Sequence, residues 1–313
     1  MKVLVTGAGG YIGSQACKAL KQAGHQIVCN DRRRIKHQYY DSVELGNYGH
    51  IDKTVLDTVD AVVHIAATSL VGPSVTDPAT YYRNNVSTTL DLLESCKASN
   101  IKNFVFASSA ACYGEPANGI CTIEDGATPM NPYGWSKRMM EVILNDYAKA
   151  YGINSVSLRF FNVAGADSDG EFGQEKQATH IVARIMESAI AGNKFTLYGN
   201  DYPTNDGTCV RDYVHVEDIA SGIVKSLDYT ANNSGAHIFN LGDGTGCSNL
   251  EIIQAVEKNT TLKVEYDTGP RREGDPAKLV ADVSETRYLG WEPKHNLDSI
   301  IKTAYKWYTR NDN

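Results

Sequence analysis

Short apolar segments alternate with amphipathic ones along most of this 313-residue chain. The first segment, Lys2–Thr6, is rich in valine and leucine, which predicts a buried β-strand. Apolar residues then recur at helical spacing at Ile12, Ala16, Ala19 and Leu20. Further expected strands are residues 26–30, 61–65, 104–108, 155–161 and 237–241, and further expected helices lie near 80–98, 134–151 and 214–227. This alternation predicts an α/β fold with a parallel sheet.

Two segments interrupt this periodicity with turn-forming residues. Residues 165–177 are polar, and residues 199–207 are rich in glycine, asparagine, aspartate and proline. Loops of this kind often carry binding residues on a rigid scaffold.

Three glycines, Gly7, Gly10 and Gly13, join the first expected strand to the first expected helix. Glycine lets the backbone turn tightly and approach a pyrophosphate, whose charge is favoured by the free N–H groups at a helix N-terminus. A second strand then closes on Asp31, where a carboxylate can hydrogen-bond an adenosine ribose. This order of elements predicts a dinucleotide cofactor, with a glycine-rich turn that holds no ligand as the alternative.

Composition argues against several classes of protein. The formal net charge of −7 disfavours nucleic acid or an anionic membrane as the main partner. No apolar run approaches the length of a membrane span, and the first strand begins at residue 2, so no signal peptide is expected. Seven scattered cysteines without a Cys-x-x-Cys pair predict reduced thiols, no metal site and a cytoplasmic protein.

Tyr133 and Lys137 are the best candidates for chemistry, because residues four apart lie on one face of a helix. They follow a strand that ends near Ser109, and open parallel sheets bind ligands beyond the carboxyl ends of their strands. Ser109 and Tyr133 are thus expected to share a hydroxyl-bearing substrate. The structural alternative is that the serine caps a turn and the tyrosine packs.

Motifs along nearly the whole chain resemble those of extended short-chain dehydrogenase/reductases, and among them those of the UDP-hexose 4-epimerases. The matching segments are TGAGGYIGS (6–14), DAVVHIAA (60–67), NNV (84–86), SSAACYG (108–114), NPYGWSK (131–137), RFFNVAGA (159–166), YGNDYPTNDGTCVRDYVHVEDIA (198–220), FNLGDGTG (239–246) and RREGD (271–275). The resemblance implies NAD-dependent 4-epimerisation of a UDP-hexose, UDP-glucose or UDP-galactose, through a transient 4-keto sugar.

The resemblance also implies roles for individual residues. The implied catalytic residues are Ser109, Tyr133 and Lys137. The residues implied in NAD binding are Gly7, Gly10, Tyr11, Ile12, Gly13, Asp31, Ala66, Asn84, Tyr133, Lys137 and Phe160. Those implied in binding the UDP-sugar are Ser109, Asn162, His180, Ile181, Tyr198, Arg211, Arg272 and Asp275. The two arginines suit a diphosphate, because their planar guanidinium groups donate in pairs.

The expected architecture is a Rossmann-type, doubly wound parallel sheet with a smaller α/β substrate-binding C-terminal domain. Residues 1–162 are expected to form the NAD-binding domain, and residues 209–241 to return to it. Residues 163–313 are expected to form the smaller domain, which binds the UDP-sugar.

Several positions depart from the family pattern. Ser69 replaces a lysine near the cofactor phosphates, and Phe160 replaces a tyrosine. The region 31–60 looks shorter than in the family. The family's adenine-binding stretch is matched only weakly, by Gly49–Asp52, so no adenine contacts are assigned. Ala110–Ala111 stands where sugar-nucleotide 4,6-dehydratases carry an Asp-Glu pair, so dehydration lacks its acid and base.

Other functions and some details stay open at this point. An NAD(P)-dependent nucleotide-sugar reductase or dehydrogenase would use the same catalytic residues, and a regulator that senses NAD or a UDP-sugar would need only the binding residues. Arg32–Arg34 could attract the extra phosphate of NADP, but Asp31 ends the strand and favours NAD. A homodimer is expected because it is the commonest oligomer. Leu279 matches a position beside the sugar C2 substituent, and its intermediate size predicts slow turnover of UDP-N-acetyl sugars.

Overall fold

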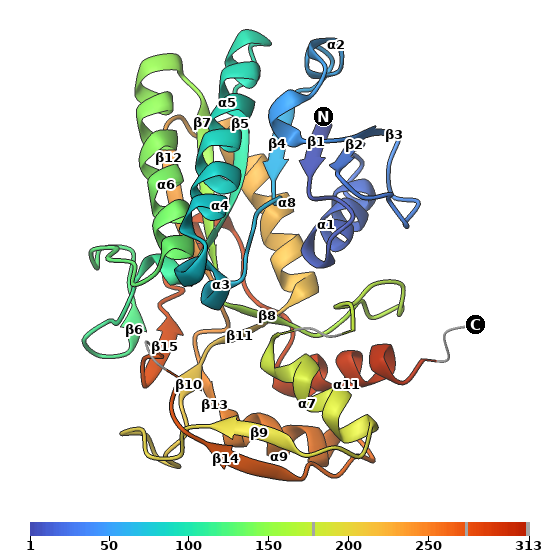
Figure 1. The fold of residues 1–313 in the computed structure, drawn as a ribbon. Helices are drawn as coiled ribbons and strands as arrows, with labels where there is room; N and C mark the ends of the chain where they lie inside the picture. The colour runs from blue at the N-terminus through green and yellow to red at the C-terminus, as the bar shows by residue number, and fades with distance from the viewer. Residues whose placement is uncertain (177–178, 273–274, 311–313) are drawn as a thin grey trace.

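A seven-stranded sheet forms one part of the computed structural model, which describes residues 1–176, 179–272 and 275–310 (Figure 1). Its strands are β1 (Lys2–Thr6), β2 (Gln26–Asp31), β3 (Ser42–Leu45), β4 (Ala61–His64), β5 (Asn103–Ser109), β7 (Asn154–Phe160) and β12 (Ala236–Leu241). The order is β12-β7-β5-β4-β1-β2-β3, and every neighbouring pair is parallel. The predicted parallel α/β sheet is confirmed, and each strand expected from the sequence lies within one residue of its observed bounds.

Four long helices cover both faces of this sheet: α1 (Tyr11–Gln22), α5 (Thr88–Ala98), α6 (Pro132–Tyr151) and α8 (Val216–Asn232). Helices α1 and α8 pack on one face, and α5 and α6 pack on the other (Figure 1). Consecutive residues of β1 therefore point into different cores: Val3 and Val5 pack with α1 and α8, whereas Leu4 packs with α5 and α6. The strands are apolar throughout because both of their faces are buried.

The strand order reverses between β1 and β4, which is the point where open α/β sheets bind ligands. The glycine turn follows β1 directly, and residues 65–67 follow β4. Both segments therefore lie side by side at the carboxyl edge of the sheet.

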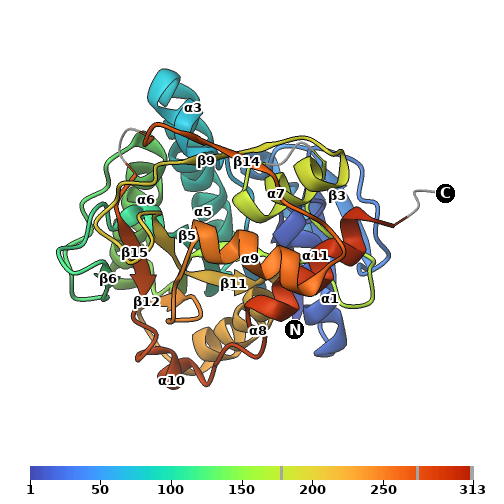
Figure 2. The same cartoon turned by 90° about the horizontal axis from the view of Figure 1, so that it is seen from below.

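A second part of the chain lies beyond this edge (Figures 1 and 2). Its strands are β6 (Ile120–Cys121), β8 (Asn162–Ala164), β9 (Phe195–Tyr198), β10 (Val210–Arg211), β11 (Tyr213–His215), β13 (Cys247–Ser248), β14 (Tyr266–Gly269) and β15 (Lys278–Ala281). Its long helices are α7 (Ile181–Ile190), α9 (Asn249–Asn259) and α11 (Leu297–Tyr308), which share one apolar core. The strands form a four-stranded sheet in the order β13-β10-β15-β6 and the two pairs β11-β8 and β14-β9.

Shorter helices and helical turns complete the secondary structure of the described residues. They are η1 (Tyr48–His50), α2 (Lys53–Leu56), α3 (Val71–Thr76), α4 (Pro78–Tyr82), the π-helical turn η2 (Arg83–Ser87), η3 (Ala110–Cys112) and α10 (Thr286–Leu289). Within residues 1–176, 179–272 and 275–310, no helix is both long and apolar enough to cross a membrane.

The chain passes between the two parts more than once. Of the segment 209–241, α8 and β12 pack with the seven-stranded sheet, whereas β10 pairs with β13 and β15 of the second part. The helix expected over 214–227 begins at Val216, because residues 213–215 form β11 and pair with β8. The boundary at residue 162 stays a prediction.

The glycine turn gives a test of how tightly α1 packs against β1. A Cβ added at Gly13 would lie 2.0 Å from the carbonyl oxygen of Gly7, so helix and turn would have to separate. Gly24 is a matched control, because its φ of +85° strains an alanine but no atom lies within 4 Å of the added Cβ. We expect Gly13→Ala to lower the free energy of unfolding by roughly 3 kcal/mol or more and Gly24→Ala by about 1 kcal/mol. Urea unfolding measures both changes, and equal losses would contradict the close packing at Gly13.

Candidate active site

One continuous cleft of about 1810 Å³ runs along the carboxyl edge of the sheet and into the second part. Single small-molecule pockets span roughly 300–1,000 Å³, so this cleft has room for two ligands or for one long ligand. Every site residue expected from the sequence lines it: Gly7, Gly10, Tyr11, Ile12, Gly13, Asp31, Ala66, Asn84, Ser109, Tyr133, Lys137, Phe160, Asn162, His180, Ile181, Tyr198, Arg211, Arg272 and Asp275. The fold thus gathers residues from positions 7 to 275 around one space.

The glycine turn forms one wall of the cleft. Gly7 has a φ of +71°, and a Cβ there would lie 2.8 Å from the backbone nitrogen of Ala66. Helix α1 follows with Gly10 as its N-cap, and no described side chain caps it. The first N–H groups of α1 therefore face the cleft without side-chain partners, which is the arrangement that binds a diphosphate.

Asp31 lies at the end of β2, next to this turn. Its carboxylate accepts hydrogen bonds from the backbone N–H groups of Gly9 (3.0 Å) and Arg33 (2.9 Å). Arg32 and Arg33 also line the mouth of the cleft, and residues 32–34 are exposed. A carboxylate that is hydrogen-bonded to Gly9 therefore lies next to the turn, whereas the arginine side chains are exposed.

Asn47 and Tyr48 line the cleft at the same end as Asp31. The sequence analysis assigned no adenine contacts in this region. The hydroxyl of Tyr48 donates to the carbonyl of Asn84, in the π-helical turn η2. Gly49 instead packs against α5, because a Cβ there would lie 2.7 Å from Cγ2 of Thr88. π-Helical turns are rare and are frequent at functional sites.

Ser109, Tyr133 and Lys137 meet at the centre of the cleft. Ser109 ends β5 and accepts a hydrogen bond from the N–H of Ala111 at 3.2 Å. Tyr133 and Lys137 lie one turn apart on α6, which can approach Ala111 closely because residue 134 is a glycine. A Cβ at Gly134 would lie 2.3 Å from the Ala111 carbonyl oxygen.

Burial shifts both ionisable groups at this centre. It raises the pKa of Tyr133 to about 12, although a hydrogen bond with Ser109 acts in the opposite direction. It lowers the pKa of Lys137 to about 8. The ammonium of Lys137 donates to the carbonyl of Ala107 at 2.7 Å. Ionisation of the phenol near neutral pH therefore needs added positive charge beside its ring.

A buried ion pair lies behind these residues, and the sequence analysis did not find it. Glu141, one turn beyond Lys137 on α6, accepts two hydrogen bonds from Arg159 of β7, at 2.9 and 2.8 Å. Ser108 donates to the same carboxylate at 2.7 Å. An arginine inside an apolar strand was the available signal, because such a residue is almost never buried without a partner.

Two arginines and an aromatic ring form the far end of the cleft. Arg211 is buried on β10; its Nη2 lies 3.4 Å from a carboxylate oxygen of Asp275 and forms no hydrogen bond with any described residue. The guanidinium of Arg272 lies over the ring of Tyr198, with its carbon 4.4 Å from the ring centroid. This end therefore offers unused donors and positive charge to an anion.

The remaining expected residues lie between these ends. Asn162 begins β8, and Ile181 begins α7 behind an exposed His180. Leu279 of β15 also lines the cleft. The sequence analysis missed Arg184, which also lines the cleft. Residues three apart on a helix share a face, so its spacing from Ile181 was an available signal.

The family model for the NAD dependent epimerase/dehydratase family matches residues 3–242. The UDP-glucose 4-epimerase of Lactobacillus helveticus is 44% identical over 320 residues, with 98% of this chain and 97% of the relative covered. The crystal structure of UDP-glucose-4-epimerase from Stenotrophomonas maltophila with bound NAD and formylated UDP-arabinopyranose has a TM-score of 0.93 and 34% identity, with 98% of both chains covered. That of UDP-glucose 4-epimerase from Brucella ovis in complex with NAD has a TM-score of 0.92 and 39% identity, with 98% of both chains covered.

These matches extend over nearly the whole chain, and the fold and the cleft agree with them. The chain belongs to the NAD dependent epimerase/dehydratase family.

Proposed function

We propose that the protein is an enzyme that interconverts UDP-glucose and UDP-galactose by NAD-dependent epimerisation at C4. The observation that carries this proposal is that Ser109, Tyr133 and Lys137 line one cleft together. A dinucleotide turn lies at one end of that cleft and a pair of arginines at the other. The relatives described above are UDP-glucose 4-epimerases.

The residues at the first end fit NAD. Gly7 and Gly13 leave space that a Cβ would fill, and the N-terminus of α1 has no side-chain cap within the described chain. Asp31 suits the ribose hydroxyls of NAD and would repel the extra phosphate of NADP. When bound there, NAD would supply the acceptor and donor of the hydride that is exchanged with C4 of the sugar.

The residues at the second end fit a UDP group. We propose that Arg211 and Arg272 hold the diphosphate, Tyr198 stacks near the uracil, and Asp275 binds the uridine ribose. Asn162, His180 and Ile181 complete the nucleotide site. In support, Arg211 has a buried nitrogen without a hydrogen bond to any described residue, and a phosphate oxygen would supply the missing acceptor.

Tyr133 is the proposed base that removes the proton of the 4-hydroxyl group. Its pKa is raised to about 12 by burial, so it needs the positive charge of Lys137 and of an oxidised nicotinamide to ionise. The pKa of Lys137, lowered to about 8, leaves it protonated at neutral pH. Ser109 can hydrogen-bond both the phenol and the sugar hydroxyl, and so align them.

Ala110–Ala111 argues against dehydration as the reaction. Both alanines line the cleft next to Ser109. A 4,6-dehydration needs an acid and a base to remove water from the sugar, and neither alanine can supply one. Epimerisation needs only the groups that are present.

A homodimer and a cytoplasmic location complete the proposal. On α6, Trp135, Met139 and Val142 are exposed apolar residues at helical spacing, and Leu90 of the neighbouring helix α5 is exposed as well. Such a patch supports self-association. All seven cysteines are free, which supports a reducing compartment.

The direct test is to incubate the purified protein, loaded with NAD, with UDP-galactose. We expect UDP-glucose to form until an equilibrium mixture is reached, with no net rise in the absorbance of reduced nicotinamide, because the hydride is returned. Chromatography of the nucleotide sugars and absorbance are followed together. Stoichiometric NADH with an oxidised sugar would instead identify a dehydrogenase, and binding without conversion would identify a sensor.

Replacement of the base gives a second prediction. Tyr133→Phe removes one hydroxyl and should lower kcat by roughly 10²–10⁴-fold, while the affinity for UDP stays unchanged. Tyr81→Phe is the matched control, because the ring of Tyr81 lies 6.4 Å from that of Tyr133 and its hydroxyl donates to the Leu70 carbonyl instead. Steady-state kinetics and calorimetry of UDP binding measure the two effects. Equal losses of turnover and affinity would assign Tyr133 a binding role.

The size of residue 279 gives a third prediction. Leu279 lines the cleft, and we propose that it lies beside the C2 substituent of the sugar. The wild-type protein should prefer UDP-galactose over UDP-N-acetylgalactosamine, because a pocket clash of this kind is worth about 1–3 kcal/mol. Leu279→Tyr should widen this preference in kcat/KM, and Leu279→Met, which conserves volume, should keep it. An equal loss on both substrates would place the residue away from C2.

A further inference from the structure

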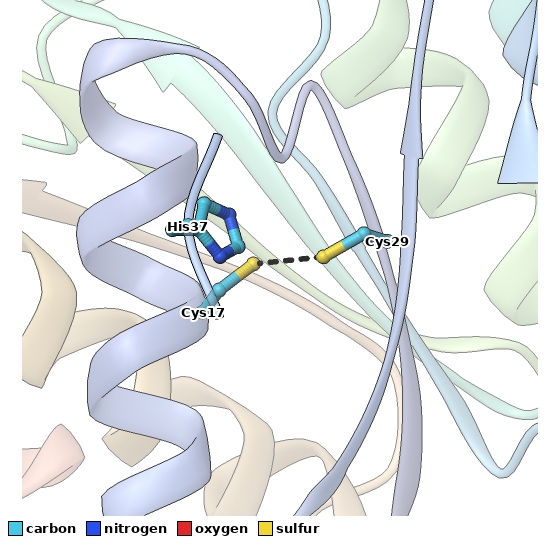
Figure 3. A group of neighbouring side chains, drawn as sticks. All are labelled: Cys17, Cys29 and His37. Atoms are coloured by element: carbon cyan, nitrogen blue, oxygen red, sulfur yellow. Dashed lines mark hydrogen bonds between the residues drawn. The ribbon is translucent and has the colours of Figure 1, made fainter. Parts of the chain in front are cut away.

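A compact cluster of Cys17, Cys29 and His37 lies beneath the glycine turn (Figure 3). Cys17 comes from α1, Cys29 from β2, and His37 from the loop that follows β2. Both cysteines are fully buried, and their sulfur atoms point toward each other, 3.5 Å apart. One candidate ligand atom from each residue lies within 4.8 Å of the other two.

The sulfur separation fits a shared metal ion better than a disulfide. Two sulfurs bound tetrahedrally at about 2.3 Å from one zinc ion lie roughly 3.8 Å apart, whereas disulfide sulfurs lie about 2.05 Å apart. The observed 3.5 Å is thus about 0.3 Å short of the metal spacing and more than about 1 Å beyond the covalent one. Small shifts of Cys17 and Cys29 would complete the metal geometry.

Two hydrogen bonds to the backbone hold the His37 ring beside the cysteines. Its Nε2 lies 3.0 Å from the carbonyl oxygen of Ala8, and its Nδ1 accepts the backbone N–H of Tyr39 at 3.2 Å. Histidine ligands usually donate their second N–H to a carbonyl or a carboxylate, which fixes the ring. If Nδ1 binds the ion, the Ala8 contact is kept, and only the Tyr39 N–H loses its acceptor.

Metal binding by the two cysteines would be coupled to loss of their protons. Cysteine binds a metal ion as the thiolate, so a cation that enters between the two sulfur atoms would release the thiol protons to solvent.

The ion would reach the cluster through one surface loop. Residues 32–41, which carry His37, form no helix or strand, and most of them are exposed. The two cysteines sit in an apolar core with Ile27 and Ile35, against which Tyr39 packs. An apolar shell of this kind excludes water and strengthens bonds between thiolates and a soft cation.

We propose that Cys17, Cys29 and His37 form a binding site for one thiophilic d¹⁰ cation, of the class of Zn²⁺ and Cd²⁺. The site has three protein ligands. The sequence analysis expected no metal site, because the three residues do not lie in a known ligand spacing. The proposal is independent of the reaction in the cleft. Its structural consequence is that a bound ion ties the loop 32–41 to α1 and β2.

The test is a titration of the reduced, metal-free protein with Cd²⁺, followed through the ultraviolet charge-transfer absorption of cadmium thiolates. We expect one equivalent per chain, and mass mapping after alkylation should find Cys17 and Cys29 protected. Cys17→Ser and Cys29→Ser should abolish the absorption, and His37→Gln should weaken binding by roughly tenfold or more. Saturating ion should raise the unfolding temperature of the wild type but not of these variants.

Two further variants serve as controls. Cys96→Ser changes another buried cysteine, and Cys247→Ser changes the one cysteine that is only half-buried. Both should keep the stoichiometry and the affinity of the wild type. His37 lies on a surface loop, so His37→Gln tests the site even if a core cysteine variant fails to fold.

Each contrary outcome has a definite meaning. Absence of the thiolate absorption in the wild type overturns the proposal, and so does its persistence in a folded Cys29→Ser protein. Loss of the absorption in Cys96→Ser or Cys247→Ser would show that cadmium binds to thiols outside the cluster, which also overturns the proposal. If mild peroxide instead removes two hydrogens and joins Cys17 to Cys29, with no cadmium bound before oxidation, the pair is a redox pair and the metal site is refuted.

Discussion

The site depends on the buried ion pair between Glu141 and Arg159. It joins α6, which carries Tyr133 and Lys137, to β7 of the sheet, and Ser108 adds β5 through a third hydrogen bond. Both charged side chains are at most 2% exposed. Without Glu141, the guanidinium of Arg159 would be a buried charge without its carboxylate partner, which would cost several kcal/mol. Helix and strands are thereby held in one relative position, and Ser109 follows directly after Ser108.

The same pair connects the sheet to the second part of the molecule. The guanidinium of Arg159 lies 4.4 Å from the ring centroid of Tyr113, and the Tyr113 hydroxyl donates to Asn240 of β12. Asn240 in turn donates to the carbonyls of Cys121 and Asp282, on either side of the β6-β15 pairing. A continuous set of polar contacts thus runs from α6 to the strand that carries Leu279. Movement of the second part would break hydrogen bonds of this network, and buried polar groups that lose their partners are costly.

Features that lie within one element could be predicted from the sequence, whereas features that depend on packing between distant segments were missed. The glycine turn and the pair Tyr133–Lys137 could be predicted, because each lies within a few residues of one element. Strand β3 was missed, since Ser42–Leu45 is at the sheet edge, where its residues are only half-buried or exposed and leave no apolar pattern. Tyr48, Glu141 and the Cys17 cluster were missed for another reason. Their partners lie 8 to 36 residues away, and no spacing rule connects them.

The uneven distribution of polar groups along the cleft suits the proposed reaction. The nucleotide end has fixed charges in Arg211, Arg272 and Asp275, and the cofactor end has the glycine turn and Asp31. Phe160 adds apolar surface beside Ser109, and Leu279 adds apolar surface beside Arg211. Epimerisation requires a ketone that can present either face to the same hydride donor. A sugar held tightly through many hydrogen bonds could not turn, whereas one held through its diphosphate can. Under the proposed function, the binding energy lies at the two ends of the cleft and the reacting ring makes few fixed contacts.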